Sequence, residues 1–194
     1  QVEMYSSHKL QEEAKKYFKQ LGLEYHRVPS GVFLLAASQE INDVNFSNKN
    51  PMVSPDGKYL YFSSDRAGGF GLYDLYKAKI KDDGSLDKVE NLGQNINTEG
   101  QEAFPFVTNE NILYFSSDGH LGLGGLDVFY SKNVDDRWSS SKNLGIPVNS
   151  GADDFAFMIK EENGYVSSNR TGGVGKDDIY GLKKIRPLCD LLLE

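Results

Sequence analysis

The amino-acid sequence predicts an all-β fold, a partial β-propeller of about three four-stranded antiparallel blades, with an N-terminal α-helix in front of it. Two short motifs recur three times, and they lie nine residues apart in every copy. The copies follow one another after 53 and then 51 residues. The first motif is Tyr61–Asp65, Tyr114–Asp118 and Tyr165–Asn169, and the second begins at Asp74, Asp127 and Asp178. Such a fixed period is the signature of a repeat architecture.

Composition excludes several classes of function. The net charge of −7 argues against nucleic acid, because its recognition needs basic patches that neutralise phosphates. The same charge disfavours docking onto an anionic lipid surface. No apolar run approaches the ~20 residues that span a bilayer, so no direct membrane span is expected. The one cysteine, Cys189, excludes an internal disulfide framework and leaves the role of its thiol open.

The N-terminal segment, residues 1–30, is expected to be helical. Apolar residues recur with helical spacing between residues 7 and 21, which places them on one face. They are Leu10, Ala14, Tyr17, Phe18 and Leu21. Ser6 or Ser7 is a suitable cap for the start, and Gly22 suits the position after the end. Two interpretations stay open: a helix packed on the flank of the β domain, or the end of a helical-repeat region.

Residues 31–186 are expected to form the blades. The strands of the first blade are predicted at 51–53, 58–63, 74–80 and 86–91. Turn residues separate them, with Pro55 and Gly57 where turn geometry favours those residues. The second blade is predicted from Phe104 to Asn143, with Trp138 on its outer strand. The third has strands at 155–160, 164–168 and 178–183, and no fourth strand.

The missing fourth strand suggests an incomplete ring. Val32–Ala37 is predicted to be a strand, and it is available to pair with the third blade. Three blades is below the usual range of about four to eight. We therefore expect the end of a longer propeller, with residues 187–194 as a tail or the start of a following domain. Open sheet edges invite pairing, so we expect a neighbouring chain, an additional segment or Val32–Ala37 to cover at least one of them.

The repeated acidic residues are expected to be structural. Catalytic residues are singular and convergent, whereas these occur once per blade. Each Asp that opens a third strand follows a glycine-rich loop, whose N–H groups it is placed to accept. Calcium is the alternative, but it requires dense oxygen ligands at fixed offsets. The histidines, His8, His26 and His120, share no metal-ligand spacing.

No cofactor or catalytic residue is expected either. The glycine loops join strand to strand, so no helix N-terminus is available for the phosphate of a dinucleotide. The sequence contains no Gly-x-Ser-x-Gly elbow. The prediction is therefore a non-enzymatic protein, with no catalytic, cofactor-binding or metal-ligating residues.

One face of the domain is the candidate partner-binding surface. Strand directions alternate within a blade, so loops 66–73, 119–126 and 170–177 should lie beside connections 93–100 and 145–152. Each of these three loops has one apolar residue in its middle, which either tucks under its own loop or joins a surface patch. The candidate binding residues are Arg66, Phe70, His120, Leu123, Arg170 and Val174. Charge reversal at Arg66 and Arg170 is expected to weaken partner capture while the domain stays folded.

Four stretches resemble the sequence motifs of one protein family, and they occur in the same order. They are Ser54–Arg66, Asn91–Glu99, Leu113–His120, and Ser167–Gly173 with Asp177–Tyr180. Over about residues 41–186 the chain resembles the WD40-like, TolB-related propeller region of OmpA-family periplasmic proteins of Bacteroidota. Several of those proteins work with the type IX secretion and gliding apparatus.

The resemblance implies a scaffold in the periplasm, associated with the outer membrane. It implies an outer-membrane barrel protein and other envelope proteins as partners. Members of the family usually carry tetratricopeptide repeats before the propeller, and a carboxypeptidase-regulatory-like domain and an OmpA-like domain after it. These residues hold no OmpA-like domain, so peptidoglycan would be reached only through a domain absent here. Two alternatives stay open: a propeller that binds glycan, with Trp138 and tyrosines stacking on sugar rings, and a propeller appended to a hydrolase.

Overall fold

The computed structural model describes residues 41–185, and this part of the chain is all-β. Its strands form three antiparallel sheets, in agreement with the predicted fold class. Three predicted segments lie outside the described residues: the helical segment 1–30, the strand Val32–Ala37 and the tail 187–194. Cys189, His8 and His26 also lie outside them.

The first sheet contains four strands in sequence order, as predicted. They are β1 (Asn48–Val53), β2 (Tyr59–Ser64), β3 (Asp74–Ile80) and β4 (Leu86–Asn91). The last two match the predicted bounds, and the first begins three residues earlier than predicted because Asn48 and Lys49 pair with Ser64 and Ser63.

The second sheet has an interrupted outer strand. Its strands are β5 (Glu102–Val107), β6 (Ile112–Ser117), β7 (Asp127–Val134), β8 (Arg137–Trp138) and β9 (Lys142–Asn143). Both β8 and β9 pair with β7. Between them the backbone N–H of Ser141 donates to the carbonyl of Asn95, 3.2 Å away in the preceding connection. The outer strand therefore leaves β7 to bond to the chain that enters the sheet.

The third sheet has only three strands in the described part of the chain, which agrees with the prediction. They are β10 (Asp154–Lys160), β11 (Asn163–Ser168) and β12 (Asp178–Lys183), in that order. β12 is an edge strand, because its only sheet partner within residues 41–185 is β11.

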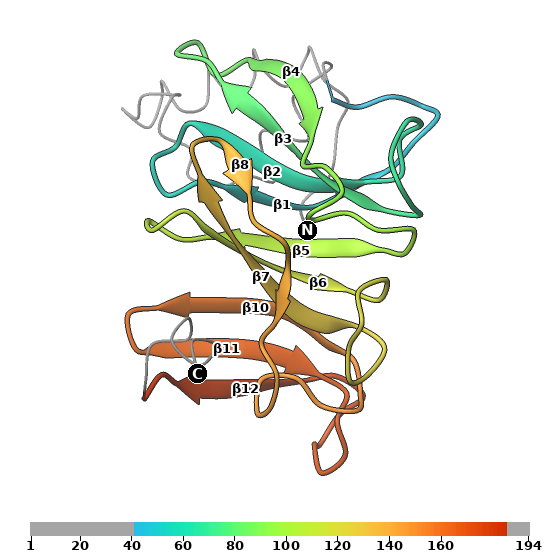
Figure 1. The fold of residues 1–194 in the computed structure, drawn as a ribbon, viewed down its shortest axis with the longest axis vertical. Helices are drawn as coiled ribbons and strands as arrows, with labels where there is room; N and C mark the ends of the chain where they lie inside the picture. Colours follow the sequence, from blue (N-terminus) through green and yellow to red (C-terminus); the bar gives the residue numbers. More distant parts are fainter. Residues whose placement is uncertain (1–40, 186–194) are drawn as a thin grey trace, which may run out of the picture.

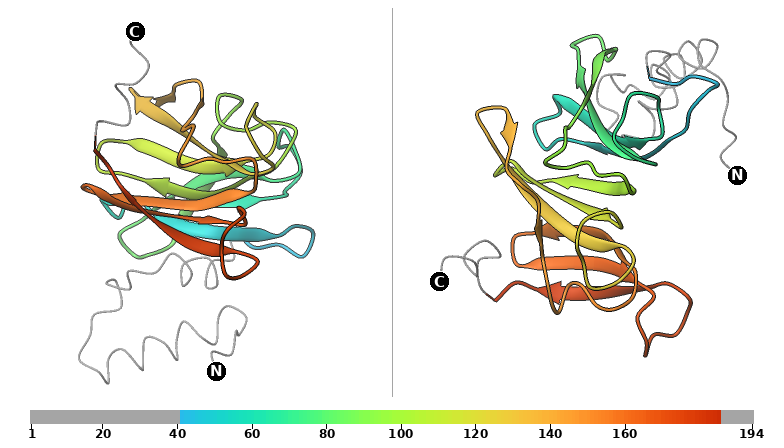
Figure 2. Two further views of the ribbon diagram at one scale, coloured as in Figure 1. Left: turned by 90° about the horizontal axis from the view of Figure 1, so that it is seen from below. Right: turned by 45° about the vertical axis from the view of Figure 1, so that its right-hand side comes forward.

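The three sheets, which we call blades, lie side by side in an open arc (Figures 1 and 2). The first and third blades are on opposite sides of the second. The first strand of each later blade packs against the preceding blade: β5 against β1, β2 and β3, and β10 against β5, β6 and β7. The loops between second and third strands all lie at the right of Figure 1, together with the connections between blades. We call this side the loop face.

The first strand of every blade contains a bulge that the sequence did not predict. The pairing register shifts within β1, β5 and β10. In each shift one residue is in the left-handed region: Asn50 (φ 53°), Phe104 (φ 52°) and Ala156 (φ 53°). Phe and Ala have no intrinsic preference for that region, so only the repeated geometry of the blade explains it. A bulge increases local twist, which suits the innermost strand of a fan of blades.

Two apolar clusters join the blades. Between the first and second blades, Tyr61 and Leu75 pack with Leu113 and Phe115, and Trp138 closes the cluster. The ring of Tyr61 meets Trp138 edge-on with centroids 6.4 Å apart.

The cluster between the second and third blades is built in the same way. Tyr114 and Val128 pack with Phe157 and Val166. Tyr114 and Val128 occupy the repeat positions of Tyr61 and Leu75, so one set of side chains makes both junctions.

We expect Leu113→Ala to lower the free energy of unfolding by about 2–5 kcal/mol, because it opens a cavity in the first of these clusters. Leu113 is fully buried, with 0% of its surface exposed. Denaturant unfolding measures the change. Leu121→Ala is the control, since its side chain is 96% exposed and should shift stability by less than about 0.5 kcal/mol. Equal effects of the two variants would contradict this assignment of the core.

Candidate functional site

The loop face is organised by the Asp that opens each third strand. Its carboxylate accepts hydrogen bonds from two consecutive backbone N–H groups of the preceding glycine-rich loop. The donors are Phe70 and Gly71 for Asp74 (2.7 and 3.0 Å), Leu123 and Gly124 for Asp127, and Val174 and Gly175 for Asp178 (2.9 and 3.1 Å). The structural role predicted for these acids is confirmed.

This turn directs the middle residue of each loop outward. Phe70 is 49% exposed, Leu123 is 50% exposed and Val174 is fully exposed. The interpretation in which these side chains tuck under their own loops is therefore wrong for Val174, while Phe70 and Leu123 are half covered and half exposed. The backbone N–H groups of all three donate to the carboxylate.

An asparagine joins each blade to the connection that follows it. The side chain of Asn97 accepts from the N–H of Leu75 (2.8 Å) and donates to its carbonyl (3.0 Å). Asn149 makes the same pair of bonds with Val128, at 2.8 Å each. Both asparagines are buried. One carboxamide thus satisfies the donor and the acceptor of a strand residue, as a neighbouring strand would.

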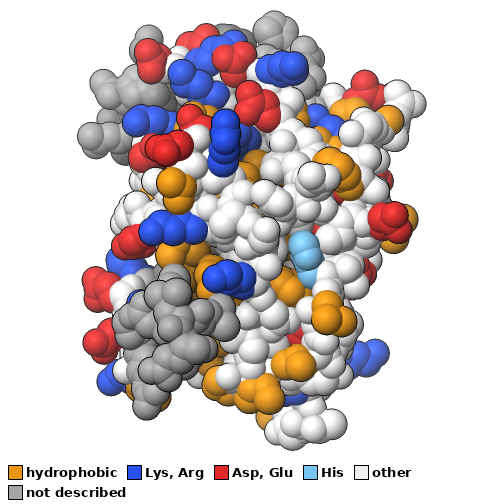
Figure 3. Space-filling view, in the orientation of Figure 1, with side chains coloured by type: hydrophobic (Ala, Val, Ile, Leu, Met, Phe, Trp, Pro, Cys, Tyr) orange, Lys and Arg blue, Asp and Glu red, His pale blue; other side chains and the backbone are white. Residues whose placement is uncertain are grey.

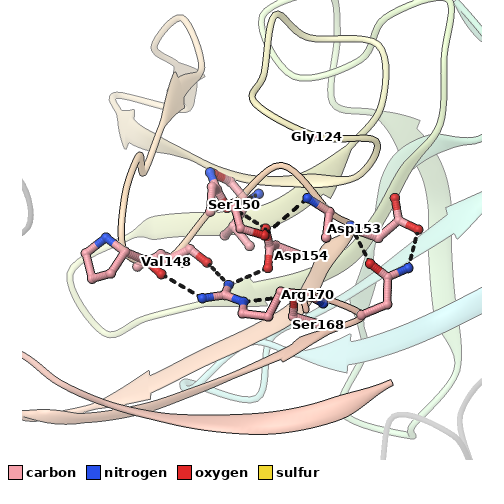
Figure 4. Close-up of polar contacts among 12 residues, drawn as sticks. Gly124, Val148, Ser150, Asp153, Asp154, Ser168 and Arg170 are labelled. Carbon is pink, nitrogen blue, oxygen red and sulfur yellow. Dashed lines mark hydrogen bonds and ion pairs between the residues drawn. The ribbon is translucent and has the colours of Figure 1, made fainter. Parts of the chain in front are cut away.

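Arg66 and Arg170 each bind their own blade to the segment that leads into it, and their charges do not stand free on the loop face. Arg170 forms an ion pair with the buried carboxylate of Asp154, and it also donates to the carbonyl of Val148 and to Ser168 Oγ at 3.0 Å (Figure 4). Arg66 donates to the carbonyl of Ile41 (3.1 Å) and to Asn48 Oδ1 (2.9 Å).

The variants expected from sequence to test binding are therefore unsuitable. Charge reversal at Arg170 would leave Asp154 buried beside a second negative charge, and breaking a buried pair costs about 3–5 kcal/mol. Reversal at Arg66 would place a carboxylate against the carbonyl of Ile41. Loss of partner capture in either variant would report unfolding.

His120 has the same role in the second blade that Arg66 has in the first and Arg170 has in the third: its side chain binds a backbone carbonyl of the connection. Its Nε2 is 2.8 Å from the carbonyl oxygen of Ile96, and its ring packs on Phe115 and Phe129 with centroids 5.9 and 5.0 Å away. Ile96 has the repeat position of Ile41 and Val148, whose carbonyls accept from the arginines. His120 lies one residue later in its loop than Arg66 does, so the sequence pattern hid this equivalence.

Two more carboxylates are buried under the loop face. Glu102 accepts from the N–H of Thr98 (2.9 Å), from Thr98 Oγ1 (2.7 Å) and from Ser117 Oγ (2.7 Å). Burial raises the pKa of the Glu102 carboxyl above its ordinary value of 4.5, and the three hydrogen bonds oppose that rise. In the third blade Asp154 accepts from the N–H and the Oγ of Ser150.

Most polar groups of the repeat are therefore bound by the protein itself, while a few buried atoms, among them Asp127 Oδ1 and Tyr76 Oη, have no hydrogen-bond partner. Asp118 and Asn169, at the end of the first motif, accept from the backbone N–H of Gln101 (2.6 Å) and Asp153 (2.8 Å). Within residues 41–185 no group of three or more His, Cys, Asp or Glu side chains is arranged to hold a metal ion. The part of the chain that the structure describes contains no helix long and apolar enough to cross a membrane. What the loop face offers to a ligand is apolar surface.

That surface extends over all three blades. Its exposed side chains come from the three glycine-rich loops and from the connections beside them. They are Val44 (100% exposed), Phe70 (49%), Leu72 (64%), Leu121 (96%), Leu123 (50%), Ile146 (81%) and Val174 (102%). Figure 3 shows hydrophobic side chains at several separate places along the loop side of the molecule, with uncharged surface and some charged groups between them. We call this set the loop-face patch.

A hollow of about 320 Å³ lies away from the loop face, between hairpins of the first and second blades. Its lining includes Tyr59, Tyr61 and Trp138, the aromatic residues expected to stack on sugar if the domain bound glycan. Trp138 is only 9% exposed, because it packs against Tyr61. Neither of these two rings therefore presents a free face to a sugar.

Comparison with known proteins supports the fold and assigns no family. No family model matches the chain, and no curated protein matches it. Among solved structures, it is similar to prolyl oligopeptidase B from Galerina marginata (17% identity, TM-score 0.51, covering 75% of this chain and 19% of that one). It is also similar to the alpha-L-arabinofuranosidase from Lactobacillus brevis (12% identity, TM-score 0.51, covering 76% of this chain and 55% of that one).

These likenesses show a propeller-like arrangement of blades and nothing about activity. The chain spans about a fifth of the peptidase and about half of the glycosidase. Its fold class is thus established as all-β and propeller-like.

We expect Asp127→Ala to lower the melting temperature, because it leaves the N–H groups of Leu123 and Gly124 without their acceptor. A buried unsatisfied donor costs about 1–3 kcal/mol. Asp82→Ala, in an exposed turn, is the control and should melt like the unmodified chain. Calcium and a chelator should leave all three proteins unchanged. A fall in the melting temperature on adding the chelator would instead indicate a metal site.

Glu102 should make stability depend on pH in a defined direction. Its pKa is raised in the folded state, so the folded protein binds this proton more tightly than the unfolded chain. Its contribution is fully present below the ordinary value of 4.5 and is lost as pH rises through the raised folded pKa. Relative to Glu102→Gln, the unmodified chain should therefore lose stability as the pH rises from about 4.5 through the raised folded-state pKa of Glu102. Denaturant unfolding at several pH values measures this difference, and a constant difference would contradict it.

Proposed function

We propose that this domain is a non-enzymatic protein-interaction module, which binds a partner protein through the loop-face patch. The proposal rests on the different uses of polar and apolar side chains on that face. The carboxylates, arginines and the histidine of the repeats are used by hydrogen bonds within the domain, while apolar side chains from all three blades are exposed. Exposed apolar side chains gathered on one face within a polar surround are typical of protein interfaces.

The chemistry of the face favours binding over catalysis. A catalytic site needs a nucleophile or an acid–base pair that converges on one point. Here Asp74, Asp127 and Asp178 are spread over three blades, and each accepts from its own loop. A partner would instead meet the exposed parts of Phe70, Leu123 and their neighbours.

The resemblance in sequence supports a location and a kind of partner. We place the domain in the periplasm, associated with the outer membrane, where it serves as a scaffold in protein secretion or gliding. Its partner is then an outer-membrane barrel protein or another envelope protein. We also propose that the open arc is part of a propeller with more blades.

A double variant, Leu121→Asp with Leu123→Asp, tests the proposal. Both side chains are exposed, so the domain should stay folded, and capture of the envelope partner should fall at least about tenfold. Pull-down from native envelopes with the tagged chain measures capture, and circular dichroism confirms folding. A barrel or other envelope protein should be recovered by the unmodified chain.

Val134→Asp is the matched control. It places one negative charge, where the double variant places two, on an exposed apolar residue (56% exposed) at the end of β7 that is opposite the loop face. Capture should remain at the level of the unmodified chain. If the double variant is folded and still recovers the same partner in full, another surface binds it. Recovery of glycan in place of protein would support the glycan-binding alternative.

A further inference from the structure

The outer side of the third blade repeats a surface that the other two blades bury. Tyr61 and Leu75 are 6% and 0% exposed, and their counterparts Tyr114 and Val128 are 4% and 0% exposed. At the same positions of the third blade, Tyr165 is 53% exposed and Ile179 is 76% exposed. These two apolar side chains face outward with Met158, which is 50% exposed.

In the first two blades these positions are buried by the next blade together with a segment of the chain that leads to it. Tyr61 and Leu75 pack with Leu113 and Phe115 of the second blade and also with Leu92 and Ile96 of that segment. The segment follows the outer strand and reads Asn-Leu-Gly-x-x-(Ile or Val)-Asn. Asn91 donates to the third-strand Asp74 at 2.7 Å, and the N–H of Leu92 donates to the carbonyl of Leu75 at 3.0 Å. Asn97 then binds the N–H and the carbonyl of Leu75.

The third blade has the same receiving groups, and no such segment lies on them in the described part of the chain. Asp178 and Ile179 correspond to Asp74 and Leu75, and they lie on β12, whose outer edge is open. In this position a polypeptide has both a strand edge to pair with and an apolar face to cover.

The space around Gly175 independently indicates that a segment is missing from this side of the third blade. A Cβ on Gly71 would stand 2.3 Å from the carbonyl oxygen of Thr98, and one on Gly124 would stand 1.9 Å from that of Ala152. These glycines make room for the connection that enters the next blade. Gly175 is their counterpart, yet a Cβ there would approach nothing closer than 3.4 Å, and that atom belongs to Asp177 of its own loop. Room is provided in the third blade for a connection that the described residues do not contain.

We infer that the open side of the third blade binds a polypeptide segment of one kind: a β-strand that ends in Asn-Leu-Gly-x-x-(Ile or Val)-Asn. The strand pairs with the edge of β12, as in the addition of a peptide strand to an exposed sheet edge. Its first asparagine reaches Asp178, and its last binds the N–H and carbonyl of Ile179. The apolar residues of the segment cover Ile179 and Tyr165. This surface is separate from the loop-face patch.

A second copy that offers its own first blade fits less well. The side of the first blade that would meet a preceding blade presents Leu60, Phe62 and Tyr76, which are already 0%, 0% and 4% exposed. They pack with Ile41 and Leu86 of the same chain. The occupant must bring its own strand and its own asparagines.

The test uses a labelled synthetic peptide with the sequence of residues 84–100, which contains the outer strand and both asparagines of the first blade. Titrated with the whole chain, it should bind saturably with one peptide per chain, as measured by fluorescence anisotropy. A peptide that carries Asn91→Ala and Asn97→Ala should bind at least about tenfold more weakly. In the protein, Ile179→Lys should weaken binding of the unaltered peptide to a similar extent. Val134→Lys, an exposed position elsewhere, should not.

Two results would overturn the inference. One is equal binding of the two peptides, or of the unaltered peptide to the unmodified and the Ile179→Lys chains. The other is a dimer in analytical ultracentrifugation that Ile179→Lys dissociates, because the surface would then belong to a second copy. Since Ile179 is exposed, Ile179→Lys should stay folded, and its thermal melting curve verifies this.

Discussion

Unpaired backbone groups in the glycine-rich loops are the constraint on which this architecture depends. A loop of this kind turns the chain between two strands and leaves N–H groups that no strand can accept, and each would cost about 1–3 kcal/mol if buried without a partner. The first residue of the third strand solves this with a carboxylate, as Asp74 does for Phe70 and Gly71. Because the acceptor is fixed to the strand, the residues four and three positions before it donate to it in all three blades. In the first two blades the second of these donors is a glycine that lies close to the next connection.

The same need to give backbone N–H and carbonyl groups a hydrogen-bond partner explains the junction between blades. The third strand of a blade presents a residue whose N–H and carbonyl face away from its sheet partner, and Asn97 or Asn149 satisfies both. A carboxamide is the one side chain that offers a donor and an acceptor in this geometry. The apolar clusters supply the stabilisation of the junction, and the asparagines fix its register. The side chains of Arg66, His120 and Arg170 each hydrogen-bond to a backbone carbonyl of the connection. These carbonyls belong to Ile41, Ile96 and Val148, each of which directly precedes an asparagine.

The sequence predicted the strands well, because repetition gives several independent readings of one pattern. The bounds of β3, β4 and β12 agree with the prediction. The bulge in each first strand was missed. Its left-handed residues are Asn50, Phe104 and Ala156, three types that share no preference, so the local sequence carries no signal for it.

The loop face was predicted less evenly. The structural role of the third-strand acids could be inferred, because a carboxylate follows each glycine loop at a fixed distance. The role of the arginines could not, since a loop Arg with no visible partner in the sequence resembles a surface charge. Its partner, Asp154 for Arg170, is 16 residues away and becomes visible only when the blade is folded. The equivalence of His120 was hidden by its shift of one residue.

The apolar residues that remain exposed can now be divided by what surrounds them. On the loop face, residues such as Leu121 and Val174 stand on loops whose backbone N–H groups donate to the third-strand Asp, and this arrangement does not require their side chains to be apolar or exposed. On the third blade, Tyr165 and Ile179 are the repeat residues themselves, and two neighbouring blades show what such residues contact. The first surface is explained by a partner outside the repeat pattern, and the second by the pattern itself. A domain of this design therefore separates the surface that extends the repeat from the surface that recognises another protein.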